Sequence, residues 1–380
     1  MIMWEQAIMD AVAKTKRNIE RFPNLFPHIT EEKRYEWGDS HDWIEGFYTG
    51  MIWLCYEYTR EPLFKETAMA HLEDYKQRLE EKRELDHHDI GFLYLPSALA
   101  AWIVDQNEDG KQLALKAADH LMLRWREEGQ YIQAWGPKDD EQNGGRIIID
   151  CMMNIPLLNW AYDQTGDDRY RVAANAHADK SRRYLMRGDD SSYHTFYFNP
   201  ADGKPISGGT HQGFHDGSTW SRGQAWAIYG FALSYRYTRD PKYLETAIRA
   251  ARFFIEHLPE DHVAYWDFDV TIEEDTPRDS SASAIAICGI LEILEHLDAE
   301  DDNIGLLTET IEKSMISLVN RYSTIGESDQ EGLIKHGSYF VRGGIGPDDY
   351  MIWGDYYYLE GLLRLAKGVP GYWYERARAN

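Results

Sequence analysis

Two aspartates, Asp89 and Asp150, are the residues best suited to acid–base chemistry. Asp150 follows the apolar run Ile147–Ile149, and burial in such surroundings raises the pKa of a carboxyl toward the neutral range, where it can donate a proton. Asp89 precedes Asp150 by 61 residues, close to one period of the repeat described below, so the two carboxyls can be neighbours that share a proton. A simpler role stays open, because an aspartate at this place also caps a helix beginning at Cys151.

The densest group of polar and aromatic residues lies at Asp216–Trp226. Arg222 carries a planar guanidinium that can bind a carboxylate through two hydrogen bonds, and Trp226 follows about one helical turn later. The pair is suited to holding an anionic sugar. Arg222 is equally suited to a structural ion pair with a neighbouring aspartate.

Histidines gather in two short segments, His87–Asp89 and His211–His215. Adjacent histidines do not share a helix face, no His-Glu-x-x-His motif is present, and the glycine of the second segment indicates a loop. The pattern therefore favours hydrogen bonding to a polyhydroxylated ligand over metal binding. The 13 tryptophans and 25 tyrosines suit the same ligand, because their rings stack on sugars, although most such rings pack a core.

Helices must position these residues, because apolar residues recur with helical periodicity and strand-like alternation is scarce. Similar turns occur at Tyr58–Phe64 and Tyr237–Tyr243, with a third copy at Gln164–Tyr170 and looser copies at Asp105–Gly110 and Asp298–Asp302. Each turn joins an aromatic-rich helix to a charged amphipathic one. The acidic residue before proline in the first two turns is a typical helix N-cap.

This recurrence predicts an all-α protein of six helical hairpins, with charged helices at about Ala114–Trp125, Tyr170–Leu185 and Tyr243–Leu258. Repeated hairpins form either an open solenoid or a closed ring. Because neither end carries a polar capping repeat, we expect closure into an (α/α)6 barrel. One domain over residues 1–380 is the expected organisation.

The first, less charged helix of each hairpin is expected on the inside of the ring. These helices are predicted to start near residues 42, 89, 150, 220, 279 and 349–353, which brings to one rim Trp43, Asp89, Asp150, Arg222, Asp279 and Asp355. Helix N-termini carry partial positive charge, so this rim suits an anionic ligand.

The composition excludes several classes of partner. The chain of 380 residues has a net charge of −24 and no basic run, which argues against nucleic acid and anionic membrane surfaces. The longest apolar stretch, about Leu93–Val104, is interrupted by Pro96, and the N-terminus lacks the pattern of a signal peptide. Cys55, Cys151 and Cys288 lie far apart in apolar runs, so we expect buried, reduced thiols in a cytoplasmic protein.

Longer segments of the chain resemble the unsaturated glucuronyl hydrolases of glycoside hydrolase family 88, over essentially the whole length. The matching segments are His87–Phe92, Gln133–Pro137, Gly144–Asp150, Asp189–Thr195, Gly208–Gly213, Trp220–Trp226, Arg278–Ser283 and Pro347–Tyr358. The resemblance implies an (α/α)6 barrel. It also implies oligosaccharide substrates that end in a 4,5-unsaturated uronic acid, the kind of product that polysaccharide lyases release.

The same resemblance implies roles for individual residues. Asp150 matches the aspartate that protonates C4 of the vinyl ether and takes a proton from the water attacking C5, and Asp89 matches a second, assisting aspartate. The hemiketal formed in this way opens and breaks the glycosidic link. The implied substrate-binding residues are Trp43, His88, Trp135, His194, His211, Gln212, Arg222 and Trp226. No metal or organic cofactor is implied, and His215 matches no known position.

Three alternatives stay open. An unsaturated rhamnogalacturonyl hydrolase would perform the same hydration beside a different sugar. A two-carboxylate glycosidase would act on saturated sugars, and a helical-repeat scaffold would bind a protein partner.

The expected sulfation preference follows from a difference between this sequence and the family pattern near the C-terminus. Family members that favour sulfated substrates carry Ser-x-x-Ser-x-Lys there, whereas residues 368–373 of this chain read Gly-Val-Pro-Gly-Tyr-Trp. We therefore expect unsulfated chondroitin or hyaluronan disaccharides, or gellan- or xanthan-derived fragments. For the assembly we expect a monomer or a weak homodimer.

Overall fold

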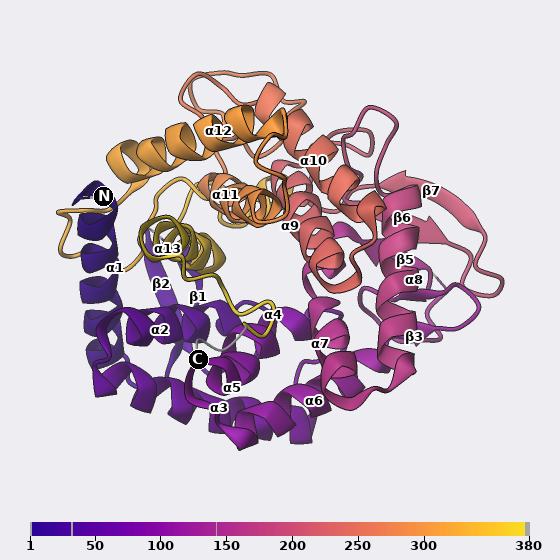
Figure 1. The fold of residues 1–380 in the computed structure, drawn as a ribbon, viewed down its shortest axis with the longest axis horizontal. Helices are drawn as coiled ribbons and strands as arrows, with labels where there is room; N and C mark the ends of the chain where they lie inside the picture. The colour runs from indigo at the N-terminus through magenta and orange to yellow at the C-terminus, as the bar shows by residue number, and fades with distance from the viewer. Residues whose placement is uncertain (1, 32, 142, 377–380) are drawn as a thin grey trace.

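A computed structural model describes residues 2–31, 33–141 and 143–376. It shows a ring of helices in two layers (Figure 1). The inner layer consists of α2 (Glu45–Thr59), α4 (Ile90–Tyr94) continuing through a π-helical turn into α5 (Ala100–Asp105), α7 (Pro156–Thr165), α9 (Ser221–Thr238), α11 (Ser280–Leu294) and α13 (Ile352–Lys367). The outer layer consists of α1 (Ile2–Arg21), α3 (Pro62–Glu81), α6 (Glu108–Met122), α8 (Asp168–Tyr184), α10 (Pro241–Glu256) and α12 (Asn303–Ser317). The predicted all-α class is confirmed, and the paired layers agree with a barrel.

The ring closes differently from six consecutive hairpins. The last inner helix, α13, packs against α1 from the other end of the chain (Figure 1). Lys367 at the end of α13 pairs with Glu5 of α1 at 3.2 Å, and Lys14 donates a 2.6 Å hydrogen bond to the carbonyl of Thr324. Within the described residues, five hairpins are therefore continuous in sequence, and the sixth pair joins helices from opposite ends of the chain.

The recurring turns end the inner helices in one common way. Arg60, Gln106, Gly166 and Arg239 follow α2, α5, α7 and α9, and all four have left-handed backbone with φ between 54° and 70°. This conformation closes a helix C-terminus by bonding its last carbonyls. The predicted acidic N-cap is confirmed at Asp240, whose side chain accepts from the Lys242 amide at 3.2 Å, but Glu61 makes no such bond.

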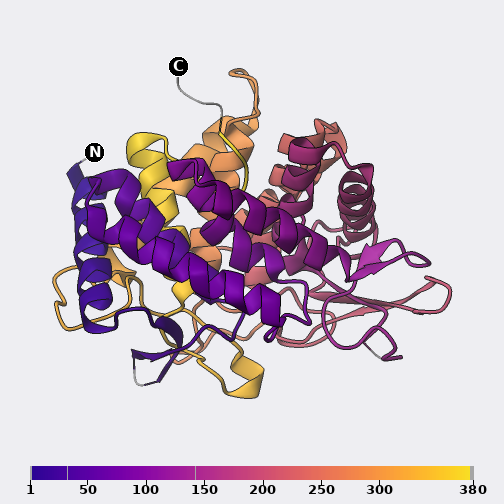
Figure 2. The ribbon, with the colours of Figure 1, turned by 90° about the horizontal axis from the view of Figure 1, so that it is seen from below.

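Three small antiparallel sheets were not predicted. They pair β1 (Phe26–Glu31) with β2 (Arg34–Gly38), β3 (Trp125–Arg126) with β4 (Tyr131–Ile132), and β5 (Arg146–Ile148) with β6 (Thr195–Phe198) and β7 (Pro205–Gly209). Their strands are two to six residues long, too short for a detectable alternation. Figure 2 shows β1, β2 and the loop before α13 extending beyond the same end of the ring, at the bottom of the view.

The inner helices are buried over most of their surface, which matches their low charge. Cys55, Cys151 and Cys288 are buried and free, as predicted. None of the helices formed by the described residues is long and apolar enough to cross a membrane.

Candidate active site

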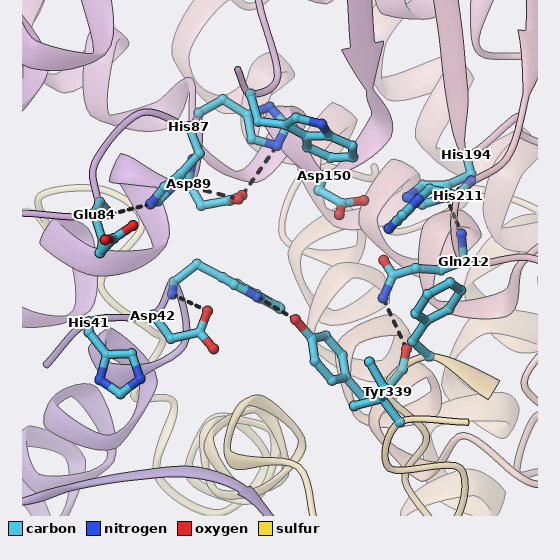
Figure 3. Close-up of a pocket in the computed structure, with 15 residues that line it drawn as sticks. His41, Asp42, Glu84, His87, Asp89, Asp150, His194, His211, Gln212 and Tyr339 are labelled. Carbon is cyan, nitrogen blue, oxygen red and sulfur yellow. Dashed lines mark hydrogen bonds and ion pairs between the residues drawn. The ribbon is translucent and has the colours of Figure 1, made fainter. Parts of the chain in front are cut away.

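A cavity of about 490 Å³ opens at the end of the ring where the inner helices begin, a size suited to a small saccharide. Figure 3 shows its side chains converging from several elements. Most of the residues predicted for the site line it, namely Trp43, His88, Asp89, Trp135, Asp150, His194, His211 and Gln212. Of the six residues expected on one rim from the helix starts, Trp43, Asp89 and Asp150 line this cavity. Two of the ten predicted site residues, Arg222 and Trp226, do not line it.

Asp150 enters the cavity from a short 3₁₀ helix, Ile149–Met153, that directly follows β5. Pairing of β5 with β6, continued by the Ile149 amide donating to the His194 carbonyl at 3.1 Å, fixes this turn. The side chain does not act as a cap: its Oδ1 is buried without a hydrogen-bond partner. Burial raises the pKa of Asp150 to about 7, against the opposing charge of Arg222. A carboxyl of this kind keeps its proton near neutral pH and can donate it.

Asp89 stands at the start of α4, and its side chain makes no capping bond either. Its Oδ1 accepts from Asn154 Nδ2 at 3.2 Å and lies 3.3 Å from His88 Nε2. Burial and the nearby charge of Asp150 raise the pKa of Asp89, while the Asn154 hydrogen bond opposes the rise. Two carboxyls so coupled titrate as a pair. Because Asp89 has hydrogen-bond donors and Asp150 Oδ1 has none, we place the shared proton on Asp150.

His87 fixes the backbone at Asp89. Its Nδ1 accepts from the Asp89 amide at 3.0 Å, and its Nε2 lies 3.0 Å from the Glu84 carbonyl. An imidazole nitrogen that accepts from an amide carries no proton, so His87 is the neutral tautomer with hydrogen on Nε2. Burial lowers its pKa to about 3, consistent with the neutral form.

His194 and Gln212 form the opposite side of the cavity (Figure 3). The Nδ1 atom of His194 accepts from the amides of His211 and Gln212 at 3.0 and 3.1 Å, which leaves the proton on Nε2. Burial, His211 and the guanidinium of Arg222 lower the pKa of His194 well below its usual value. His194 is therefore a neutral hydrogen-bond donor and not a cation.

Aromatic rings form two flat surfaces in the cavity. Trp43 stacks on Trp353 with ring centroids 5.2 Å apart, and its Nε1 donates to the Tyr339 hydroxyl at 3.2 Å. Trp135 packs edge-on against His211 at 5.5 Å, and the Arg146 guanidinium lies 4.6 Å from its ring. Rings that are held in place on their other face or edge offer an ordered surface for stacking a sugar.

Arg222 does not line the cavity. Its guanidinium pairs with Asp279 at 2.6 Å and donates to the carbonyls of Ser338 and Tyr339. The structural ion pair that the sequence left open is therefore formed, and direct contact with a sugar carboxylate is not what the geometry shows. Arg222 instead anchors the loop that brings Tyr339 to the cavity.

Trp226 is also behind the cavity wall. It is buried and packs against Phe92 and Tyr357 at 5.0 and 5.5 Å. Phe92 in turn contacts Trp43, with centroids 5.6 Å apart, so Trp226 supports a cavity residue through one intervening ring.

Two further expectations about the rim need correction. Asp279 is the true N-cap of α11, accepting from the Ser281 and Ala282 amides, and does not line the cavity. Asp355 is buried elsewhere, where it accepts from the Tyr35 hydroxyl at 2.9 Å. Residues 368–373, which support the expected preference for unsulfated substrates, do not line the cavity, and Trp373 packs in the core against Tyr357.

Seven cavity residues are not among the ten predicted site residues, although His87 lies in one of the two histidine segments expected to hydrogen-bond a ligand. They are His41, Asp42, Glu84, His87, Tyr339, Phe340 and Ile345, and Asn154 adds support from behind Asp89. Asp42 and His87 flank predicted positions and were within reach of the helix-start argument. Tyr339, Phe340 and Ile345 lie in a long loop with no repeat signal, and tertiary contacts place this loop, among them the hydrogen bonds from Arg222, Gln212 and Trp43 to Tyr339.

The two sides of the cavity differ in charge. Its acidic side carries Asp42, Glu84 and Asp89, while Arg146 and Arg342 lower the pKa of His211 on the other side, after burial. With Arg222 near His194, three guanidiniums thus stand behind the His194–Gln212 side. The positive charge on the His194–Gln212 side favours an anionic group of a ligand at that side. Asp150 lies between the two sides in Figure 3.

A helical ring holding a pair of close carboxyls and flanking aromatic rings over a saccharide-sized cavity is an arrangement typical of glycoside hydrolases. Comparison with known proteins agrees with this class. The family model of Glycosyl Hydrolase Family 88 matches residues 14–367. The chain belongs to this family and is a glycoside hydrolase.

Named relatives span the full chain. An unsaturated glucuronyl hydrolase of Bacillus sp. (strain GL1) is 56% identical, over 99% of this chain and 100% of its own, and its crystal structure superposes with a TM-score of 0.97. An unsaturated chondroitin disaccharide hydrolase of Streptococcus pneumoniae is 40% identical, over 97% and 93% of the two chains. A variant of the Streptococcus agalactiae unsaturated glucuronyl hydrolase, solved with dGlcA-GalNAc6S, is 38% identical with a TM-score of 0.87, over 97% and 93% of the two chains.

Proposed function

We propose that this chain hydrolyses oligosaccharides whose non-reducing end is a 4,5-unsaturated glucuronic acid, and that it does so by hydrating the C4=C5 bond. Family membership and the names of the relatives support the substrate class. The observation that carries the proposal is Asp150, a cavity carboxyl with a pKa near 7 and a buried oxygen free of hydrogen bonds. Protonation of a vinyl ether carbon needs an acid of this strength at neutral pH.

The reaction requires one proton donor that then becomes a base. Asp150 gives its proton to C4, and the positive charge that develops is shared between C5 and the ring oxygen. Water attacks C5 and returns a proton to the Asp150 carboxylate, so the protonation state of the enzyme is restored. The hemiketal at C5 then opens, and the glycosidic bond breaks with release of the neighbouring sugar.

Asp89 assists in its ionised form. Its carboxylate, oriented by Asn154 and His88, stabilises the positive charge of the transition state and can orient the attacking water. The negative charge of ionised Asp89 also makes it harder for Asp150 to lose its proton, because two adjacent negative charges are unfavourable.

The uronate carboxylate is proposed to face His194 and Gln212. The Nε2–H of His194 and the amide of Gln212 can donate to it, and the guanidiniums behind this side supply positive potential without direct contact. The sugar ring would then lie between Trp43 and Trp135, with C4 directed at Asp150. His88 and His211 complete the proposed binding set.

A preference for unsulfated substrates follows from the charge of the cavity. Among the described residues that line it, none is lysine or arginine, and four are carboxylic acids. A sulfate on the neighbouring sugar would therefore gain no ion pair and would meet negative charge. A comparison of kcat/KM for sulfated and unsulfated unsaturated chondroitin disaccharides tests this, and a clear preference for the sulfated substrate would contradict it.

For the remaining properties, we propose a cytoplasmic protein, because its three cysteines are buried and free. We also propose a single catalytic domain that needs no metal or organic cofactor for the hydration, since Asp150 supplies both the acid and the base. A monomer or weak homodimer is proposed, which sedimentation analysis would test.

The substitution Asp150→Asn tests the proposal. It keeps the shape of the side chain and removes the acid, so we expect the rate of loss of the ultraviolet absorbance of the C4=C5 bond to fall at least about 100-fold. The matched control is Asp355→Asn, because Asp355 is also buried with a pKa near 7 but lies outside the cavity. The control should keep its activity within a few-fold. Asp150→Asn retaining more than a few per cent of wild-type activity would contradict the assignment.

The alternatives are separated by the same signal. A two-carboxylate glycosidase acting on saturated sugars leaves no C4=C5 absorbance to lose. An unsaturated rhamnogalacturonyl hydrolase loses it only with the corresponding rhamnose-linked substrate, so a parallel assay of both substrates identifies the neighbouring sugar.

A further inference from the structure

A group of potential metal ligands lies outside the catalytic carboxyls, where β1 meets the start of α2. It consists of His28 in β1, His41 in the loop after β2, and Glu45 in the first turn of α2. One ligand atom from each residue lies within 4.8 Å of the others. His41 is exposed at the edge of the catalytic cavity (Figure 3), while His28 and Glu45 are buried.

One backbone carbonyl fixes both imidazole rings. The Asp39 oxygen lies 3.1 Å from His28 Nε2 and 2.7 Å from His41 Nδ1. A carbonyl oxygen only accepts, so each of these nitrogens carries a hydrogen, and the other nitrogen of each neutral ring has a free lone pair. Histidine ligands of metal ions have this arrangement, in which the second ring nitrogen donates to a carbonyl or carboxylate and holds the tautomer.

The second ring nitrogen of His28, Nδ1, has no hydrogen-bond partner. His28 is 8% exposed, and its Nδ1 is buried without a hydrogen-bond partner. This atom lies 3.5 Å from Glu45 Oε1. A lone pair that faces a carboxylate oxygen at this distance is repulsive unless a proton or a cation lies between them.

The Glu45 carboxylate is held firmly by its own neighbours. Its Oε1 accepts from the amides of His41 and Asp42 at 2.9 and 2.5 Å, and its Oε2 lies 3.3 Å from Arg78 Nη1. Hydrogen-bonded carboxylates of this kind are normal metal ligands, because the outer contacts fix their orientation. The net charge of −24 favours the approach of a cation, and exposed His41 leaves a path for it.

We propose that His28 Nδ1, His41 Nε2 and the Glu45 carboxylate bind one Zn²⁺ ion, with water in the remaining position. Two imidazoles and a carboxylate suit zinc better than the oxygen-seeking Mg²⁺ or Ca²⁺. Tetrahedral bonds of about 2.0–2.2 Å place ligand atoms roughly 3.3–3.6 Å apart. His28 Nδ1 and Glu45 Oε1 already have this separation at 3.5 Å, so binding requires the His41 side of the group to close by up to about 1.5 Å.

The ion would act on the cavity without taking part in the hydration. It would tie β1 and the loop at His41 to the start of α2, and this loop carries Asp42 and Trp43 into the cavity. Zinc binding is therefore expected to order the Trp43 side of the substrate site and to stabilise the fold.

Isothermal titration of the chelator-treated full chain with ZnCl₂ tests the proposal. We expect one site per chain, no comparable heat with MgCl₂, and a rise in Tm of roughly 3–5 °C at zinc about a hundredfold above its Kd. His41→Ala should weaken zinc binding at least about tenfold and abolish the Tm shift. His28→Gln, which removes the buried ligand, should do the same.

The matched control is His257→Ala. Like His41, His257 is exposed, contacts a neighbouring ring and has its Nδ1 2.7 Å from a backbone carbonyl, but it has no part in the group. Its zinc affinity should equal that of the unsubstituted chain. The proposal is overturned if zinc does not bind, in which case a proton separates His28 from Glu45. It is equally overturned if zinc binding survives His41→Ala and His28→Gln, because the ion then binds elsewhere.

Discussion

Substitution of Asn154 tests whether Asp89 is the ionised carboxyl of the pair and Asp150 the protonated one. It is buried, its Nδ2 donates to Asp89 Oδ1 and to the Asp150 carbonyl at 3.2 Å, and its Oδ1 accepts from the Phe92 amide at 2.8 Å. The hydrogen bond from Asn154 is one of two contacts that stabilise the ionised Asp89 carboxylate, the other being that of His88 Nε2 at 3.3 Å. In Asn154→Ala this stabilisation is lost while both carboxyls remain.

The size of the effect follows from the contact. A hydrogen bond to a charged group contributes about 1.5–3 kcal/mol, and at 3.2 Å the lower end applies. Since about 1.4 kcal/mol corresponds to one pKa unit, the pKa of Asp89 should rise by roughly one unit. The acidic limb of the kcat profile should move up by the same amount, because the active form of the pair carries a single proton.

The assay is the initial rate of absorbance loss at saturating substrate between about pH 4 and pH 9. We expect kcat at the optimum to fall roughly tenfold and stability to fall by about 1–3 kcal/mol, because the Phe92 amide loses its acceptor. Asn159→Ala serves as the control, since Asn159, which lies in α7, is also buried and is outside the cavity lining. An unshifted acidic limb in a folded Asn154→Ala protein would refute the assignment of Asp89 as the ionised partner.

Three further predictions concern charge. Because the pKa of Asp150 is about 7, the acid form is lost as pH rises, and kcat of the unsubstituted chain should fall about tenfold per unit above this value; a flat profile up to pH 9 would exclude Asp150 as the acid. Arg222→Ala should raise KM at least about tenfold by releasing the loop at Tyr339, and an unchanged KM would show that Arg222 does not position this loop for substrate binding. Burial alone would raise the pKa of Glu292, but His296, Arg364 and Arg236 lower it to about 2 from 4.5. The corresponding stability, about 3 kcal/mol, is present above pH 4.5 and is lost as pH falls toward 2. Urea unfolding of Glu292→Gln should therefore show a loss near pH 3 that is less than half of the loss at pH 7, whereas equal losses would contradict the linkage.

The fold was predictable from the sequence where local chemistry repeats. The turns at Arg60 and Arg239 share one helix-ending conformation, so the chain marks the ends of its inner helices in a readable way. The closing contact between α1 and α13 was not predictable in this form, because it joins opposite ends of the chain and leaves no local signal. Short strands such as β5 depend on partners about 50 residues away.

The site was predictable in part for the same reason. Asp89, Asp150 and Trp43 stand at helix starts, and helix starts can be located from sequence. Arg222 also stands at a helix start, but its direction depends on Asp279 and on two carbonyls in a distant loop. Residue type and spacing therefore identified the Arg222 guanidinium as suited to binding a carboxylate. The tertiary contacts determined that it binds the carboxylate of Asp279 and not that of a sugar.

Hydration of the C4=C5 bond is tested most directly by a time course of two signals from one reaction with an unsaturated glucuronyl disaccharide. One signal is the ultraviolet absorbance of the C4=C5 bond, and the other is the appearance of the released sugar. Hydration consumes the double bond before the glycosidic link breaks, so absorbance loss should match or precede sugar release at every time point. Displacement at the anomeric carbon would release the sugar first, and an absorbance loss that lags behind sugar release would contradict the central claim.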